Sequence, residues 1–246
     1  MPVAWNRVLI VGASSGIGAA MAQQLAARGS QVAAVARRQS ELDAVAAKAS
    51  GRIRAYAFDT TRFEDVAELF ERIAKDLGGL DAIVYAAGVN PRVVEHEYAF
   101  DKDWQMVDVN MIGAMAWLSP AAATFEAARQ GTIVGISSIA GERGRRTNPG
   151  YTASKAGMTA YLEALRNKCS RYGVNVVTAK PGFVDTDMTK GLPGLFWLIS
   201  ADEAARRIIA MADRGRSASG FVPRRWALVA LIVRHLPSFV FRRLNF

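Results

Sequence analysis

The stretch that decides the fold is Arg7-Val8-Leu9-Ile10-Val11-Gly12-Ala13-Ser14-Ser15-Gly16-Ile17-Gly18. Its first five residues form a short apolar run with β-branched side chains, which predicts a strand buried on both faces. Helix-forming residues follow from Ala19 to Arg28, and Gly29 then ends the predicted helix. Strand, glycine-rich turn and helix in this order are the context that a dinucleotide-binding motif requires.

Each glycine of the turn has a predicted task. Gly12 would allow the tight turn, Gly16 a close approach of the backbone to a pyrophosphate, and Gly18 close packing of helix on strand. The anion would lie over free N–H groups at the helix start. The spacing is G-x-x-x-G-x-G, not the commoner G-x-G-x-x-G, and a turn without a ligand is the alternative. The candidate contacts are Gly12, Ser14, Ser15, Gly16, Ile17 and Gly18.

Strand-like runs alternate with helical patterns along the rest of the chain. This alternation predicts an α/β protein with a doubly wound parallel sheet covered by helices on both faces. The 246 residues are 51% hydrophobic and can bury a large core, and no linker or repeat interrupts them. We expect one domain over 1–213, with an apolar lid at about 186–200, and a last strand plus a basic hydrophobic segment over 214–246. The strand-like runs are 31–36, 53–58, 82–86, 132–137 and 174–179.

A second pattern is Tyr151-Thr152-Ala153-Ser154-Lys155, with Ser138 13 positions upstream. On a helix over 150–172 the tyrosine and the lysine share a face, so the ammonium comes near the phenol. A nearby cation lowers the pKa of a tyrosine from its free value of about 10. Such a phenol can donate a proton to a carbonyl or take one from an alcohol. Taken alone, the pair is more typical of packing and a solvated charge.

Together these motifs resemble the short-chain dehydrogenase/reductase family. The resemblance implies a Rossmann fold and hydride transfer between a nicotinamide dinucleotide and a carbonyl or alcohol. One departure is Tyr85, which stands where the family usually has an asparagine, and this casts doubt on local stability. The matching motifs occur in family order over roughly residues 5–190: Val11 to Gly18, Ala86-Ala87-Gly88, Asn110, Ile136 to Gly141, Tyr151-x-x-x-Lys155 and Pro181-Gly182.

The resemblance also implies a catalytic tetrad of Asn110, Ser138, Tyr151 and Lys155. Tyr151 exchanges the proton, and Lys155 lowers the pKa of Tyr151 and binds the nicotinamide ribose. Ser138 donates a hydrogen bond to the substrate oxygen. Asn110 breaks its helix and holds a water of the proton relay. Further implied cofactor contacts are Asp59, Ala87, Gly88, Pro181, Gly182, Val184 and Thr186, besides Tyr151 and Lys155 themselves.

The end of the second predicted strand indicates which dinucleotide binds. A free ribose 2′-hydroxyl is usually held by an acidic side chain at this position. Here Ala36 replaces the acid, and Arg37 and Arg38 follow it. Because a guanidinium suits a phosphate, we predict NADP(H), with Arg37 as the main contact and Arg38 as the second. A solvated arginine pair is the alternative.

The predicted lid is strongly apolar, and its two glycines, Gly191 and Gly194, allow it to move. An apolar lid favours a hydrophobic small-molecule carbonyl or alcohol, lipid-like or steroid-like, and excludes water. Simple packing of a short helix is an equally good interpretation. We therefore predict an NADP-dependent oxidoreductase acting on CH–OH groups, a carbonyl reductase. The alternative is a non-catalytic dinucleotide-binding redox sensor or membrane-associated scaffold.

Seven arginines and no acidic residue lie between Arg214 and Phe246, around the apolar run 226–233. Three interpretations stay open for 224–246: contact with an anionic membrane surface, packing on a second subunit, or folding over its own substrate cleft. The run is too short to span a bilayer. No nucleic-acid partner is expected, because the arginines match no nucleic-acid-binding fold. A homo-oligomer, either a dimer or a tetramer, is expected.

Two further observations bound the function. Cys169 is the only cysteine, which excludes an intrachain disulfide and indicates a reducing compartment. We expect a cytoplasmic protein, with the inner face of a membrane as a further location. His96 and His235 have no partners at ligand spacing, so no metal is expected.

Overall fold

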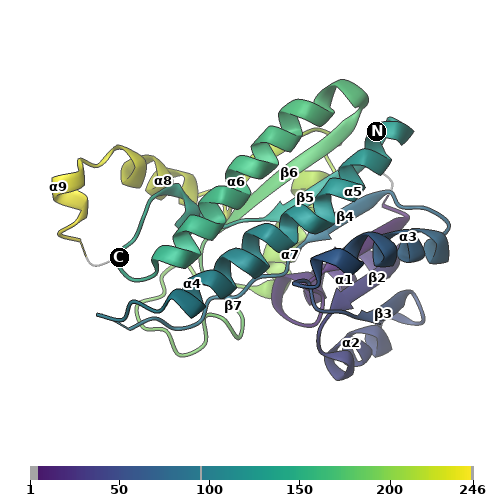
Figure 1. Cartoon of the computed structure of the whole chain (residues 1–246), viewed down its shortest axis with the longest axis horizontal. Coiled ribbons are helices and arrows are strands. Elements are labelled where there is room, and N and C mark those ends of the chain that lie inside the picture. The colour runs from purple at the N-terminus through teal and green to yellow at the C-terminus, as the bar shows by residue number, and fades with distance from the viewer. Residues whose placement is uncertain (1–4, 95, 245–246) are drawn as a thin grey trace.

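The computed structural model describes residues 5–94 and 96–244 of the chain. Seven parallel strands form one sheet in the order β3-β2-β1-β4-β5-β6-β9, with helices on both faces (Figure 1). The predicted α/β class, doubly wound parallel sheet and single domain are therefore confirmed. The strands are β1 Arg7–Val11, β2 Gln31–Ala36, β3 Ile53–Ala57, β4 Ala82–Tyr85, β5 Gly131–Ile136, β6 Val174–Pro181 and β9 Ala218–Val222.

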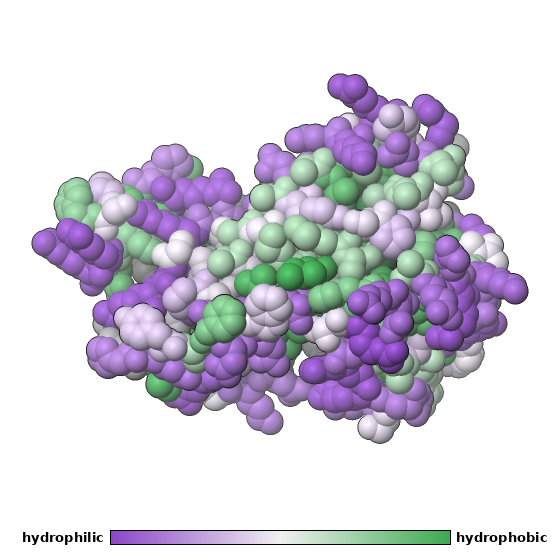
Figure 2. All heavy atoms as spheres, viewed as in Figure 1, coloured by the Kyte–Doolittle hydropathy of each residue, from purple (hydrophilic) through white to green (hydrophobic). Residues whose placement is uncertain are grey.

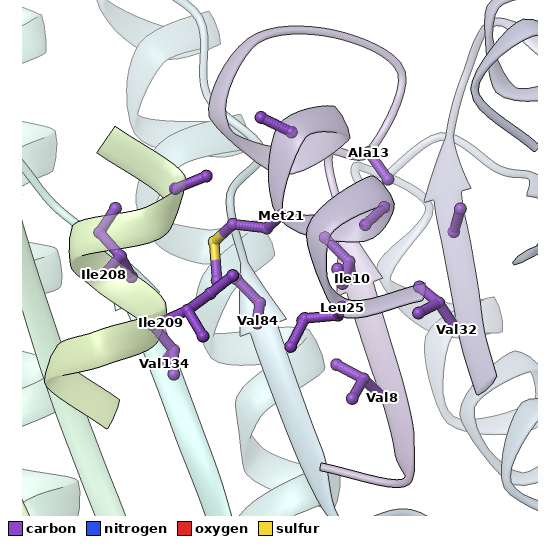
Figure 3. Close-up of a cluster of buried hydrophobic side chains, with 14 of the residues drawn as sticks. Val8, Ile10, Ala13, Met21, Leu25, Val32, Val84, Val134, Ile208 and Ile209 are labelled. Carbon is purple, nitrogen blue, oxygen red and sulfur yellow. The ribbon is translucent and has the colours of Figure 1, made fainter. Parts of the chain in front are cut away.

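The alternating side chains of the buried strands divide the core into two layers. Val8 and Ile10 of β1 belong to the first layer, whereas Leu9 belongs to the second. In the first layer Met21 and Ile208, from two helices distant in sequence, lie over the same strands (Figure 3). The helices of this layer are α1 Gly16–Ala27, α2 Gln39–Ala46 and α7 Ala201–Ala212.

The second layer contains the largest buried side chains. Trp117 is fully buried and meets Phe58 edge to face, with ring centres 5.7 Å apart. Hydrophobic side chains also gather on the outer surface across the middle of the face formed by α5 and α6 (Figure 2). The helices on this side are α3 Val66–Leu77, α4 Phe100–Val107, α5 Gly113–Ala128 and α6 Pro149–Cys169.

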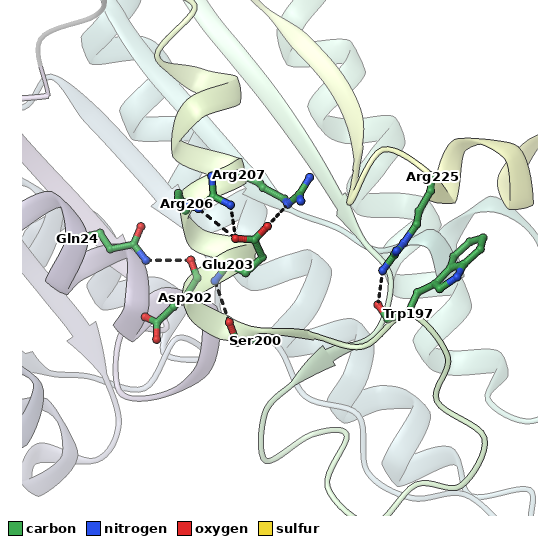
Figure 4. Close-up of polar contacts among 8 residues, drawn as sticks. All are labelled: Gln24, Trp197, Ser200, Asp202, Glu203, Arg206, Arg207 and Arg225. Atoms are coloured by element: carbon green, nitrogen blue, oxygen red, sulfur yellow. Dashed lines mark hydrogen bonds and ion pairs between the residues drawn. The ribbon is translucent and has the colours of Figure 1, made fainter.

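The predicted lid is an excursion between two short strands. Val184 of β7 pairs with Ile199 of β8, so the excursion begins and ends at the same place. At its end Ser200 accepts a hydrogen bond from the Glu203 N–H at 3.1 Å and caps α7 (Figure 4). The short elements are η1 Ala47–Ala49, η2 Phe63–Asp65, the π-helical turn η3 Asp108–Ile112, η4 Ile139–Glu142, η5 Ser170–Tyr172, β7 Val184–Asp185 and β8 Ile199–Ser200.

After β9 the chain forms two helices, α8 Trp226–His235 and α9 Ser238–Phe241, at the left of Figure 1. Trp226 is buried against the domain, whereas Leu228 and Leu231 are exposed. No helix among the described residues has the length and apolar character needed to cross a membrane. The segment is thus attached to the domain at its start and carries an apolar face outward.

Tyr85, at the position where the resemblance implies an asparagine, forms a buried hydrogen bond. Its side chain is fully buried, and its hydroxyl donates to the Val109 carbonyl at 2.6 Å. Gly113 makes room for it, because a Cβ there would lie 2.4 Å from the hydroxyl oxygen. The substitution therefore fastens β4 to the π-helical turn, which removes the doubt about local stability.

Candidate active site

A cleft of about 800 Å³ opens at the carboxyl ends of the strands. It lies where the strand order reverses between β1 and β4, which is the usual ligand site of such sheets. Of the predicted site residues, only Asn110 and Asp59 do not line it. The lining includes Gly12, Ser14, Ser15, Gly16, Ile17, Gly18, Arg37, Arg38, Ala87, Gly88, Ser138, Tyr151, Lys155, Pro181, Gly182, Val184 and Thr186.

The phosphate loop packs tightly against the turn after β4. Gly12 has φ +90°, and a Cβ there would lie 2.3 Å from the Ala87 nitrogen. Gly16, at φ +55°, opens α1, and its preceding residue Ser15 makes no side-chain cap. The first turn of α1 also has no acidic residue. These features leave helix N-terminal N–H groups for an anion, so the loop fits a dinucleotide pyrophosphate.

The two arginines after β2 differ in how they are held. Arg38 donates to the hydroxyls of Ser14 and Ser15 at 3.2 and 3.3 Å, and it pairs with Glu41 at 2.6 Å. Arg37 is exposed and also lines the cleft. Arg38 is therefore fixed beside the phosphate loop, although the sequence had given Arg37 the larger role.

Asp59 stands outside the lining. Its carboxylate accepts hydrogen bonds from the N–H and the hydroxyl of Thr61, at 3.0 and 2.9 Å. Thr60, which the sequence analysis passed over, lines the cleft instead. The structure thus gives Asp59 a local role in its turn and brings its neighbour to the site.

Tyr151 and Lys155 lie on the first turns of α6, as the spacing predicted. Asn148 caps this helix by accepting from the Tyr151 N–H at 3.3 Å, and Pro149 occupies its first position. The Lys155 ammonium is 5.9 Å from the centre of the Tyr151 ring. Ser138 follows β5 and faces the same cleft. The residues of the predicted proton-transfer group thus come from two elements, α6 and the end of β5.

The pKa of Tyr151 is controlled by opposing effects. Burial raises it, while a hydrogen bond with Ser138 and the charge of Arg145 lower it. Lys155 was predicted to be the cation that lowers it. That role stays a prediction; desolvation lowers the pKa of Lys155 itself to about 8, and its ammonium donates to the Ile136 carbonyl at 3.0 Å. Burial is the largest of these effects, so the pKa of Tyr151 stays raised above its ordinary value.

Arg145 is a cleft residue that the sequence analysis did not name. It lines the cleft in the loop between η4 and α6, and burial lowers its pKa. No hydrogen bond or ion pair joins it to another residue within 5–94 and 96–244. A signal was present, because a second arginine follows it just before the helix that carries Tyr151.

Asn110 lies behind the cleft, fully buried in the π-helical turn. Its side-chain oxygen accepts from the Val89 N–H at 2.7 Å, and its amide nitrogen donates to the Ser154 hydroxyl at 3.0 Å. Asn110 therefore joins the turn after β4 to α6. The chain forms a π-helical turn around Asn110, and both the break in the helical ladder by its side chain and the water contact stay predictions.

The C-terminal segment contributes no residue to the lining of the cleft. The last of the lining residues along the described chain is Leu192, so the interpretation that 224–246 folds over its own cleft is not supported. No group of three or more histidine, cysteine or acidic residues that could hold a metal occurs within the described residues. Hydroxyl, amide and cationic side chains line the cleft, together with the carboxylate of Asp187.

Comparison with known proteins agrees with this geometry. The chain is 33% identical over 183 residues to a human 3-oxoacyl-[acyl-carrier-protein] reductase, covering 74% of this chain and 77% of that one. It is 31% identical over 185 residues to an acetoacetyl-CoA reductase of Shinella zoogloeoides, covering 75% and 76%. Both relatives match well over two thirds of the chain.

A solved structure matches the whole fold. The crystal structure of a short chain dehydrogenase from Burkholderia cenocepacia in complex with NADP superposes with a TM-score of 0.85 at 23% identity, covering 100% of both chains. Residues 214–246 lie within this match, so they are not supported as an extension of the fold. Residues 6–193 match the family described as short chain dehydrogenase. The chain is a member of the short-chain dehydrogenase/reductase family of oxidoreductases.

Proposed function

We propose that this protein is a carbonyl reductase that transfers hydride from NADPH to a ketone or aldehyde of a hydrophobic substrate. The observation that carries the proposal is that Ser138, Tyr151 and Lys155 line the same cleft as the phosphate loop. A sensor or scaffold would need only the dinucleotide site. A phenol and a serine hydroxyl that face the same cleft are the groups that proton transfer to a carbonyl requires.

The preference for NADP(H) is supported by the end of β2. Arg37 and Arg38 line the cleft there, and the last residue of β2 is Ala36, where an acidic side chain would hold a free ribose hydroxyl. Arg38, held by Ser14 and Ser15, presents a fixed guanidinium to a 2′-phosphate, and Arg37 adds a second cation. Lys155, at the opposite end of the cleft, would bind the nicotinamide ribose.

The chemistry divides between the cofactor and the chain. When bound, the reduced nicotinamide supplies the hydride. Tyr151 donates its phenolic proton to the carbonyl oxygen, and the Ser138 hydroxyl hydrogen-bonds the same oxygen as negative charge develops. We expect the charge of Arg145, which lines the same cleft, to stabilise the phenolate that remains. Asn110 holds α6 in place through Ser154.

A hydrophobic substrate is supported by the lid. Met188 and Leu192 line the cleft, and Phe196, Trp197 and Leu198 are exposed beside it. We propose a lipid-like or steroid-like ketone. The names of two relatives, a 3-oxoacyl-[acyl-carrier-protein] reductase and an acetoacetyl-CoA reductase, favour the lipid-like ketone, since both name a ketone on an acyl chain.

We propose further that α8 and α9 contact an anionic membrane surface, with the protein on the cytoplasmic face. Leu228, Leu231, Ile232 and Phe239 are each more than half exposed, at 61%, 57%, 51% and 57%. Arginines precede and follow this apolar face, at 224–225 and 242–243. An exposed apolar helix face with basic neighbours is typical of interfacial binding.

Replacing Tyr151 with phenylalanine tests the reaction. We expect Tyr151→Phe to lower kcat for NADPH oxidation by about 10²- to 10⁴-fold, because the proton donor is lost while the ring remains. The assay uses acetoacetyl-CoA and a 3-oxosteroid, and Tyr161→Phe on the same helix is the control. Equal rates for Tyr151→Phe and wild type would contradict the mechanism, and NADPH binding without any turnover would favour the sensor.

The cofactor contacts are tested by Arg37→Ala and Arg38→Ala. We expect the KM for NADPH to rise by about 10- to 100-fold in each, since each loses a charge-assisted contact, while the KM for NADH stays constant. Arg52→Ala, on an exposed arginine away from the cleft, is the control. A wild-type preference for NADH would refute the assignment.

The role of Arg145 is tested by pH dependence. Removing its charge in Arg145→Met raises the pKa of Tyr151, so the phenol stays protonated to higher pH. Carbonyl reduction, which needs the protonated form, should therefore decline at higher pH than in wild type, as measured by kcat/KM across the alkaline range. Arg146→Met is the neighbouring control, and a profile unchanged by Arg145→Met would sink this role.

Membrane contact by α8 and α9 is tested by vesicle flotation. The test compares wild type with a Leu228→Ser, Leu231→Ser, Ile232→Ser triple variant. Wild type should float with phosphatidylglycerol vesicles but not with phosphatidylcholine alone, because the basic rim needs anionic headgroups. The variant should stay at the bottom. Wild type that never floats contradicts membrane contact, and a lower mass of the variant by light scattering would show that this face packs on a second subunit of a homo-oligomer.

A further inference from the structure

The position of Ser138 depends on the turn that follows it. The Ser138 hydroxyl accepts a hydrogen bond from the Ala140 N–H at 3.0 Å, and its carbonyl accepts one from the Gly141 N–H at 3.2 Å. Both donors belong to η4, the single turn that ends at Glu142. A shift of η4 would therefore move the hydroxyl that faces the substrate.

Glu142 fixes the end of this turn by two ion pairs. Its side chain is 1% exposed and lies 2.8 Å from the ammonium of Lys180, which is itself 7% exposed. The other carboxylate oxygen meets the guanidinium of Arg234 on α8. These contacts are charge pairs rather than well-aligned hydrogen bonds. A carboxylate buried this deeply requires opposite charge beside it.

Each partner of Glu142 belongs to a different part of the site. Lys180 immediately precedes Pro181 and Gly182, which line the cleft. Arg234 lies in the last turn of α8, in the C-terminal segment. The single carboxylate thus joins the serine turn, the end of β6 and the tail.

The next residue, Arg143, holds the same helix end. It donates to the carbonyls of Val233, at 2.7 Å, and Leu236, and it lies over the Phe241 ring at 4.2 Å from the centre. A cation at the carboxyl end of a helix is favoured by the helix dipole. Glu142, the last residue of η4, and Arg143, the residue after it, therefore both bind α8.

The start of α8 touches the other side of the cleft. The Trp226 ring packs against Phe183 and Phe196, with ring centres 5.4 and 5.0 Å apart. A Cβ at Gly182 would lie 2.0 Å from this ring. Both ends of α8 are thus fastened to segments that line or border the active site.

We propose that the C-terminal segment braces the active site, with Glu142 and Arg234 as positioning residues for Ser138 and for the Pro181–Gly182 turn. The inference rests on the proposed function only in naming Ser138 as a catalytic group. Because misplacement of a catalytic group by about 1 Å can lower the rate about 10²-fold, the brace sets turnover without touching substrate. A displacement of α8 would therefore change the position of the Ser138 hydroxyl.

The test compares Arg234→Met with Arg234→Lys, which keeps the charge, and with Glu142→Gln. The matched control is Arg206→Met, which breaks an exposed ion pair with Glu203 on α7 (Figure 4). We expect Arg234→Met and Glu142→Gln to lower kcat for acetoacetyl-CoA about 10-fold or more, with the Kd for NADPH unchanged. Arg234→Lys and Arg206→Met should retain wild-type kcat.

Hydrogen exchange of residues 138–143 gives a second readout that needs no turnover. These amides should exchange faster in Arg234→Met than in wild type or Arg206→Met, at a temperature where all are folded by circular dichroism. Faster exchange with no turnover in wild type would support the brace while rejecting the proposed function. Unchanged exchange, or a kcat that falls only in proportion to Tm, would overturn the brace. If Glu142→Gln does not fold, the half-exposed Arg234 decides the question.

Discussion

The structure depends on how closely the turns at the carboxyl edge of the sheet approach one another. A Cβ on Gly12 would lie 2.3 Å from the Ala87 nitrogen, and one on Gly18 would lie 2.1 Å from the Gly12 carbonyl oxygen. One on Gly88 would come within 3.4 Å of the Lys155 ammonium. Residues without side chains therefore bring the phosphate loop, the turn after β4 and the helix of Tyr151 to a single cleft.

Cationic side chains line the cleft both at the end of β2 and near Tyr151. Arg37 and Arg38 lie at the end of β2, whereas Lys155 and Arg145 lie near the phenol. Burial disfavours every charge at the phenol end, which raises the pKa of Tyr151 and lowers those of both cations. A cation that makes no ion pair with a described residue is thus available to a developing phenolate.

The C-terminal segment 224–244 has two different sides, one packed against the rest of the domain and one exposed to solvent. Its inner side consists of Trp226 and Arg234, which contact the lid and the serine turn. Its outer side presents exposed leucine and isoleucine side chains. One short segment can therefore connect events at the molecular surface to the position of Ser138.

The sequence by itself determined the sheet, the phosphate loop and the pairing of Tyr151 with Lys155, because these depend on short-range patterns. Buried strands, helix starts and an i, i+4 spacing are all local properties.

Only the tertiary structure decided which charges meet. Arg145 and Tyr151 are brought to one cleft by a loop that has no regular pattern, and Glu142, Lys180 and Arg234 come from three distant segments. The spacing placed Lys155 near the phenol, and the tertiary structure adds a hydrogen bond from its ammonium to the Ile136 carbonyl. The strength of an electrostatic contact depends on the distance between the charges and on their burial. For residues far apart in the sequence, local sequence patterns predict neither quantity.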